Sequence, residues 1–140
     1  MSTEANKALI QKWVDEVLNT RDVSNNSLAY ELVAADFVGH FPGQPPIEGL
    51  EAYRQFGALY FSAFPDLWLR QQALYHADDA VIVECRFGGT HSGVWAGVAP
   101  TGRSVDVESA LIFVFEGANL ICEKVYFDNA TILRQLGALA

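Results

Sequence analysis

An apolar stripe near the start of the chain repeats at the spacing of one helix face. It consists of Leu9, Trp13 and Val17, with Ile10, Val14 and Leu18 running beside them. This spacing predicts an amphipathic helix of about four turns, with Ser2 or Thr3 as its N-cap. Polar turn-formers end the pattern, and residues 27–34 form a shorter stretch with helical character.

Aromatic side chains dominate the next helical pattern. A brief strand is predicted from Phe37 to Phe41, before a turn rich in proline and glycine. A helix then follows over residues 50–63, and Pro65 ends it. Its aromatic face is formed by Tyr53, Phe56, Tyr60 and Phe64, with Gly57 between them. This helix therefore presents rings rather than aliphatic side chains to its neighbours.

Beyond Leu67 the pattern changes to strand-like alternation. Four strands are predicted over residues 67–77, 80–91, 104–117 and 119–128. Tight turns fit at 78–79 and 117–119, and a short apolar helix closes the chain around Leu136. This order predicts a single domain over residues 1–140 of the α+β class. Three N-terminal helices would cover one face of a curved antiparallel sheet, and the resulting cone could hold a ligand.

The last predicted strand carries the most informative carboxylate. By strand alternation Asp128 shares a face with Tyr126, whereas Glu123, Val125 and Phe127 share the other. A carboxylate among aromatic rings has its pKa raised by desolvation and suits general acid–base work. Asp128 also directly precedes the final helix, where it could simply be the N-cap. The residues alone leave both interpretations open.

The stretch "GTHSGVWAGVAPTGR" at residues 89–103 places many turn-formers around one histidine. His91 could bind a substrate oxygen, or it could bond the backbone of the turn. Trp95 would face inward beside it, with Gly97 and Gly102 as flexible ends of a wall or lid. Arg86 could orient a carboxylate in the cavity, or it could form surface ion pairs with cross-strand partners.

Composition narrows the class of protein further. The apolar fraction is 51% and the charged fraction only 19%, which favours extra apolar surface in a cavity or a subunit interface. A net charge of −8 argues against a nucleic-acid partner. Cys85 and Cys122 lie in apolar runs and are expected to be reduced and buried. Neither a secretory signal nor a membrane span is recognisable, so we expect a cytoplasmic protein. The three histidines lack metal-ligand spacing.

Four short motifs carry a family resemblance along most of the chain. They are "FPD" at 64–66, "GTHSG" at 89–93, "PTGR" at 100–103 and "YFD…LRQLG" at 126–137. In this order and spacing the chain resembles the SnoaL-like polyketide cyclases of the nuclear transport factor two-like superfamily, which have a cystatin-like fold.

That resemblance implies a cone-shaped barrel with an apolar pocket, usually dimeric through its open sheet face. It implies that Asp128 is the general acid–base of an intramolecular aldol closure, that His91 lies in the pocket, and that no metal or organic cofactor is needed. The ligand would be small and hydrophobic or polyketide-like. The candidate pocket residues are His40, Phe41, Tyr53, Phe56, Tyr60, Arg86, Trp95 and Tyr126.

The same superfamily leaves other functions open, because a fold does not determine a reaction. An epoxide hydrolase or isomerase could use the same pocket. A hydrolase would need Glu84, Arg86 and Asp128 all to point inward. A non-catalytic ligand-binding or dimerisation module is the third possibility, with Asp128 only capping the final helix.

Overall fold

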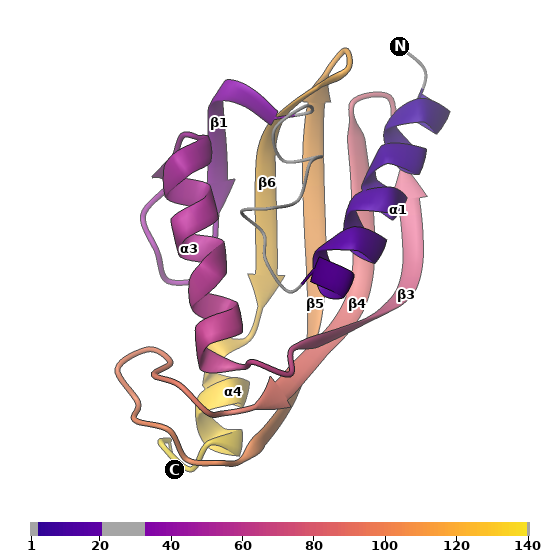
Figure 1. Cartoon of the computed structure of the whole chain (residues 1–140). Helices are drawn as coiled ribbons and strands as arrows, with labels where there is room; N and C mark the ends of the chain where they lie inside the picture. Colours follow the sequence, from indigo (N-terminus) through magenta and orange to yellow (C-terminus); the bar gives the residue numbers. More distant parts are fainter. Residues whose placement is uncertain (1–2, 21–32, 140) are drawn as a thin grey trace.

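The computed structural model describes residues 3–20 and 33–139. Figure 1 shows a single sheet with two long helices lying across it and a short helix at one end. In chain order the elements are α1 (Thr3–Thr20), β1 (Val33–His40), β2 (Ile47–Glu48), α3 (Leu50–Ala63), β3 (Trp68–His76), β4 (Ala80–Thr90), β5 (Ser104–Glu116), β6 (Asn119–Phe127) and α4 (Asn129–Gln135). The α+β class is confirmed.

The sheet is mixed rather than wholly antiparallel. Its strand order is β2-β1-β6-β5-β4-β3, and β3 to β6 form the predicted antiparallel meander. Strand β1, however, pairs with β6 in parallel, from Val38 opposite Cys122 to His40 opposite Lys124. This pairing joins segments more than eighty residues apart and leaves no local pattern in the sequence. The sheet is curved but stays open, with β2 and β3 at its edges.

Local patterns located most of the elements correctly. Helix α3 has the predicted bounds, and each strand of the meander ends within one residue of its prediction. Strand β1 begins at Val33, four residues earlier than expected, and the two-residue strand β2 was not predicted. The helical stretch expected at 27–34 lies outside the described residues, except for its last two residues, which begin β1.

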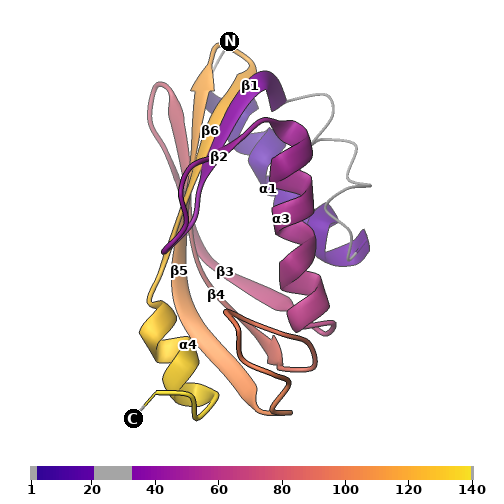
Figure 2. The same cartoon turned by 90° about the vertical axis from the view of Figure 1, so that its left-hand side faces the viewer.

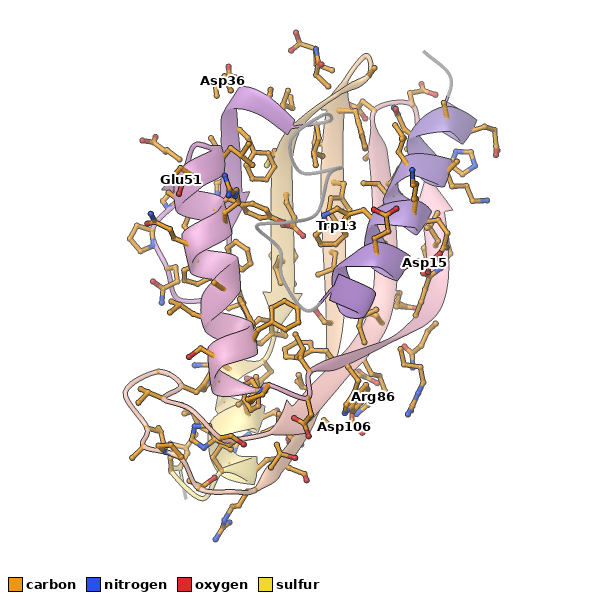
Figure 3. The ribbon with its side chains drawn as sticks, viewed as in Figure 1. Trp13, Asp15, Asp36, Glu51, Arg86 and Asp106 are labelled. Carbon is orange, nitrogen blue, oxygen red and sulfur yellow. The ribbon has the colours of Figure 1, made fainter. Side chains whose placement is uncertain are left out.

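Helices α1 and α3 lie on the same side of the curved sheet, as Figure 2 shows. Helix α1 contacts β3 and β4, whereas α3 contacts β1 and β2. Trp13 extends from α1 toward the sheet, while Asp15 lies on the opposite side of that helix (Figure 3). Trp13 packs edge-on against Phe113 of β5, with ring centroids 5.3 Å apart. The amphipathic pattern thus places Ile10, Trp13 and Val14 in the main core, over the half of the sheet formed by β3, β4 and β5.

A second, smaller core lies at the end of the sheet where α4 and residues 91–103 meet. Phe64, Phe87 and Ile132 are among its buried members. Helix α4 is fastened to β5 by two hydrogen bonds between Gln135 and the backbone of Asp106, each 2.9 Å long. The "LRQLG" end of the chain therefore docks on the sheet rather than beside the helices.

Gly93 lies where residues 91–103 cross the end of α3. Its backbone amide donates to the carbonyl of Ala63 at 3.1 Å. A β-carbon at this position would lie 2.2 Å from the carbonyl oxygen of Ser62, far inside contact distance. The turn-formers in this stretch thus permit a close approach between two backbones.

We predict that Gly93→Ala destabilises the fold by about 1–3 kcal/mol, because the backbone must shift to accommodate one methyl group. Urea denaturation measures this change in the free energy of unfolding. Ser92→Ala is the matched control, since Ser92 is exposed and its side chain makes one long hydrogen bond of 3.3 Å, while its backbone bond to Ala63 does not depend on the side chain. Equal stability of the two variants would contradict the close approach.

Candidate functional site

A cavity of about 120 Å³ lies between the helices and the sheet. Its walls are almost entirely apolar, and they come from α1, α3, the segment after α3 and every strand from β3 to β6. The lining residues are Trp13, Phe41, Tyr53, Gly57, Tyr60, Phe61, Leu67, Leu69, Cys85, Phe87, Ser109, Leu111, Glu123, Val125 and Phe127. Within this lining Glu123 is the single carboxyl group.

Glu123 points from β6 into this cavity. Its side chain is only 2% exposed, and its Oε1 atom has no hydrogen-bond partner among the described residues. The hydroxyl of Tyr53, on α3, donates a hydrogen bond to the carboxyl group. No lysine, arginine or histidine belongs to the described lining. Glu123 is therefore a buried acid with one hydrogen-bond donor and one free oxygen.

Burial raises the pKa of Glu123 to about 7, although the hydrogen bond from Tyr53 acts in the opposite direction. Desolvation dominates because the carboxylate loses its water and gains no cation. Burial and the nearby charge of Glu123 likewise raise the pKa of Tyr53 and Tyr60. Near neutral pH both protonation states of Glu123 are populated, whereas both tyrosines keep their hydroxyl protons. The group is thus able to accept and return a proton at that pH.

Gly39 makes room for this arrangement on the neighbouring strand. It lies directly opposite Glu123 in the pairing of β1 with β6. A β-carbon on Gly39 would come within 3.1 Å of the Phe41 ring and 3.4 Å of the Tyr53 ring. The missing side chain lets Tyr53 reach across β1 toward the carboxyl group.

Asp128 occupies a different environment from the one expected. It is the N-cap of α4 and accepts hydrogen bonds from the Thr131 hydroxyl at 2.8 Å and the Ala130 amide at 3.0 Å. The bond from Thr131, with the others, lowers the pKa of Asp128, so the expected upward shift is wrong. The carboxylate is exposed to solvent and does not line the interior cavity. The contacts of Asp128 are thus those of a helix N-cap, and its catalytic role stays a prediction.

His91 is fully buried but lies outside the cavity lining. Its Nδ1 atom accepts from the Thr101 amide at 3.1 Å, with the Thr101 hydroxyl 3.0 Å away. Its backbone pairs with Gly102 and Arg103. These bonds tie the two ends of the 91–103 segment together and use Nδ1, whereas Nε2 is buried with no hydrogen-bond partner among the described residues.

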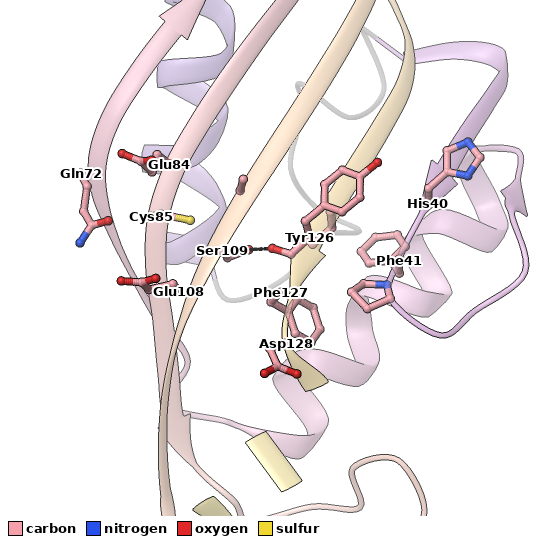
Figure 4. Close-up of a pocket in the computed structure, with 13 residues that line it drawn as sticks. His40, Phe41, Gln72, Glu84, Cys85, Glu108, Ser109, Tyr126, Phe127 and Asp128 are labelled. Atoms are coloured by element: carbon pink, nitrogen blue, oxygen red, sulfur yellow. Dashed lines mark hydrogen bonds between the residues drawn. The ribbon is translucent and has the colours of Figure 1, made fainter. Parts of the chain in front are cut away.

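A second, open groove of about 760 Å³ lies on the opposite face of the sheet (Figure 4). Tyr126 and Asp128 lie along one side of it, with Glu84 and Glu108 on the other. His40 also belongs to this groove, and Tyr126 is 56% exposed there. The hydrolase set of Glu84, Arg86 and Asp128 is thus not assembled in the interior cavity.

Arg86 is engaged on that outer face by two acidic neighbours. Its guanidinium donates to Asp106 at 2.8 Å and to Glu108 at 3.1 Å. Arg86 and Asp106 lie close together near the end of the sheet (Figure 3). Of the two interpretations of Arg86, the contacts therefore match the cross-strand ion pairs. Arg86 does not belong to the described lining of the cavity that holds Glu123.

The remaining candidates divide between the cavity and its surroundings. Phe41, Tyr53 and Tyr60 line the cavity. Phe56 packs behind Phe41 at 4.6 Å between ring centroids, and Trp95 packs behind Tyr60 at 5.1 Å.

Sequence reasoning missed Glu123 as a site residue, although one signal was present. Strand alternation already placed it on the face shared with Val125 and Phe127. A carboxylate on an otherwise apolar strand face is the signal that could have identified it.

The fold is an α+β fold whose helices cover one face of the sheet and enclose an apolar cavity with one buried acid. This architecture defines the class of small ligand-binding domains to which cyclases and isomerases belong. The chain belongs to the SnoaL-like polyketide cyclase family, whose sequence profile matches residues 8–136. Comparison with curated proteins gave no match.

Solved structures agree with this assignment. IdmH from Streptomyces antibioticus, a candidate polyketide cyclase, is 27% identical, with a TM-score of 0.70 over 87% of this chain and 91% of its own. A candidate SnoaL-like polyketide cyclase from Jannaschia sp. CCS1 is 25% identical, with a TM-score of 0.76; the match covers 81% of this chain and 79% of that protein. A Catenulispora acidiphila protein with a ketosteroid isomerase-like fold, solved with trimethylamine, is 19% identical, with a TM-score of 0.74 over 100% and 96%.

No helix among the described residues is long and apolar enough to cross a membrane.

We predict that Glu123→Gln stabilises the fold by about 3 kcal/mol at pH 8 and has little effect below pH 4.5. Between pH 4.5 and about 7 the folded protein keeps a proton that the unfolded chain has released, so stability is lost as the pH rises through that window. Glutamine removes this titration. Urea denaturation at both pH values measures the difference. The exposed Glu84 gives the matched control Glu84→Gln, and an identical pH dependence of the two variants would contradict a shifted Glu123.

Proposed function

We propose that the protein catalyses cofactor-free proton transfer at carbon, in an intramolecular aldol cyclisation of a small polyketide-like β-dicarbonyl compound, with Glu123 as the general acid–base. The observation that carries this proposal is the buried Glu123 carboxyl, with a free oxygen and a pKa of about 7, in an otherwise apolar cavity. Membership of the cyclase family supports the reaction class.

The chemistry follows from the residues of the cavity. Ionised Glu123 takes the acidic α-proton of the substrate, and the electron pair passes onto the carbonyl oxygen as an enolate. The hydroxyl of Tyr60 stabilises that oxygen by hydrogen bonding, because burial keeps this phenol protonated. The enolate carbon then bonds to a second carbonyl carbon. Protonated Glu123 returns its proton to the new alkoxide, which restores the carboxylate.

An isomerase using the same residues is the second candidate. In that reaction Glu123 would return the proton to a different carbon of the same enolate, so no ring would close. Its support is the same single carboxyl with a tyrosine hydroxyl nearby. A hydrolase is less well supported, because it needs a second acid or base, and Glu84 and Asp128 line the outer groove instead.

We predict that Glu123→Gln lowers α-proton exchange of small β-keto esters about 10²- to 10⁴-fold, as expected for loss of a general base. Proton NMR in D₂O measures this exchange above the buffer background. The rate should rise as the pH passes about 7 and then level off, because only the ionised carboxylate accepts a proton.

The matched control is Asp128→Asn, which keeps a good N-cap and should keep turnover. Loss of exchange in Asp128→Asn with full activity in Glu123→Gln would return the catalytic role to Asp128 and reject this proposal. Ring closure and isomerisation are then distinguished by the mass and the proton spectrum of the product.

We also propose that two copies associate through the outer face of the sheet. Ile82 and Ile112 lie opposite each other there and are half-buried in the single chain. Tyr75 is 54% exposed and lies opposite Ile82. These three apolar side chains form one row across neighbouring strands, and an exposed apolar row bordered by charged residues fits a subunit interface.

We predict that Ile112→Lys converts a dimer to a monomer without unfolding it, since the new ammonium group would lose its water in the interface and would lie beside Lys124, which is directly opposite. Light scattering coupled to size-exclusion chromatography measures the mass. Leu59→Lys on α3 is the control, because Leu59 is also a large exposed hydrophobic residue but lies on a helix away from that face. A wild-type protein that is monomeric at micromolar concentration would contradict the proposal.

A further inference from the structure

We propose that the interior cavity binds small, fully alkylated ammonium ions, with Glu123 as the counter-ion and the surrounding aromatic rings as the cage. Such binding does not require the cavity to catalyse a reaction, so it stands apart from the cyclase proposal.

Aromatic rings form much of the cavity wall. Seven of the fifteen lining residues are aromatic, and they come from several different elements, so rings face the cavity from several directions. The rings are gathered closely: the centroids of Phe41 and Tyr60 lie 6.0 Å apart, and those of Phe87 and Phe127 lie 5.1 Å apart. A cation within about 6 Å of a ring centroid is attracted by the ring quadrupole, and this attraction is strongest where water is excluded.

The negative charge in the cavity has no protein counter-ion. Among the described lining residues Glu123 is the only carboxylate, and none is a lysine, arginine or histidine. The titratable groups that face it are Tyr53 and Tyr60 from α3, Cys85 from β4 and the neighbouring thiol of Cys122. None of them carries a positive charge. Because a buried carboxylate is costly unless it is paired, a ligand cation would supply the missing partner.

The size and polarity of the cavity select the kind of cation. An apolar protein cavity of about 150 Å³ holds one benzene molecule, and this one measures about 120 Å³. A primary ammonium group needs acceptors for three N–H donors. Besides the Glu123 carboxylate, the described lining offers the hydroxyls of Tyr53, Tyr60 and Ser109. The Tyr53 hydroxyl already donates to Glu123, and the Ser109 hydroxyl donates to the carbonyl of Tyr126 at 3.0 Å. The rest of the wall is apolar, so methyl groups, which need no acceptor, suit it better than the N–H groups of a primary ammonium ion.

The test uses tetramethylammonium chloride, with tert-butanol as a neutral probe of similar size and shape. Isothermal titration calorimetry at pH 8 should show tetramethylammonium binding, with affinity falling roughly 100-fold at pH 5 as Glu123, whose pKa is about 7, takes up a proton. Binding of tert-butanol should not strengthen as the pH rises.

Variants separate charge recognition from simple filling of the cavity. Glu123→Gln should lose the pH dependence and bind tetramethylammonium at least roughly 100-fold more weakly at pH 8, because it has no ionised fraction at any pH. Tyr60→Leu, which keeps the charge and removes one ring, should bind it several-fold more weakly. Glu84→Gln, on the outer face, should bind it as the wild type does.

Two results would overturn the proposal. One is equal affinity of the folded wild type for tetramethylammonium and tert-butanol at pH 8. The other is tight tetramethylammonium binding by Glu123→Gln, which would place the site elsewhere. Failure of the ammonium proposal leaves proton exchange on β-keto esters unaffected, and failure of exchange leaves ammonium binding unaffected. The two proposals are therefore tested independently.

Discussion

The carboxyl group of Glu123 is buried under α3 with a single hydroxyl donor and no cation, and the neighbouring structure is arranged around this constraint. Gly39 on the adjacent strand has no side chain, so Tyr53 reaches over β1 and donates to the carboxyl group. On the other side of β6, strand β5 places Phe113 directly opposite Glu123. An ionised carboxylate in these surroundings is unfavourable. The fold therefore tolerates Glu123 chiefly because the group can hold a proton up to about pH 7.

The pairing of β5 with β6 controls which side chain enters the cavity. Its register shifts between Val114 and Phe115, which pair with Cys122 and Leu120 and leave Ile121 as the extra residue. Strict alternation would put Leu120 and Glu123 on opposite faces, yet both are buried on the helix side. The extra residue lets the strand keep Leu120 in the core while turning Glu123 inward. A regular strand that kept all four residues from 120 to 123 would place one of the two on the outer face.

The sequence patterns predicted elements well where the signal is local. The aromatic spacing from Tyr53 to Tyr60 and the stop at Pro65 define α3, and strict alternation defines the meander. Parallel pairing of β1 with β6 depends on contacts between distant segments, and a two-residue strand has no period. The contacts of Asp128 could not be decided locally either. The local sequence is the same whether the carboxylate before a helix accepts hydrogen bonds from the helix amides or points into a cavity. The position of α4 in the folded chain decides between these two environments.

The residues that carried the family resemblance mostly join parts of the structure together. Asp66 accepts hydrogen bonds from the Thr90 amide and hydroxyl, each at 2.7 Å. His91 accepts from the Thr101 amide and so holds together the two ends of the 91–103 segment. Asp128 caps the start of α4. These bonds surround the smaller core and fix one end of the sheet.

In the cavity, by contrast, one ionisable group has two forms near neutral pH. Protonated Glu123 can donate to a neutral oxygen, and ionised Glu123 can take a proton from carbon or face a cation. Both proposals for this cavity therefore depend on the protonation state of Glu123, which its burial sets.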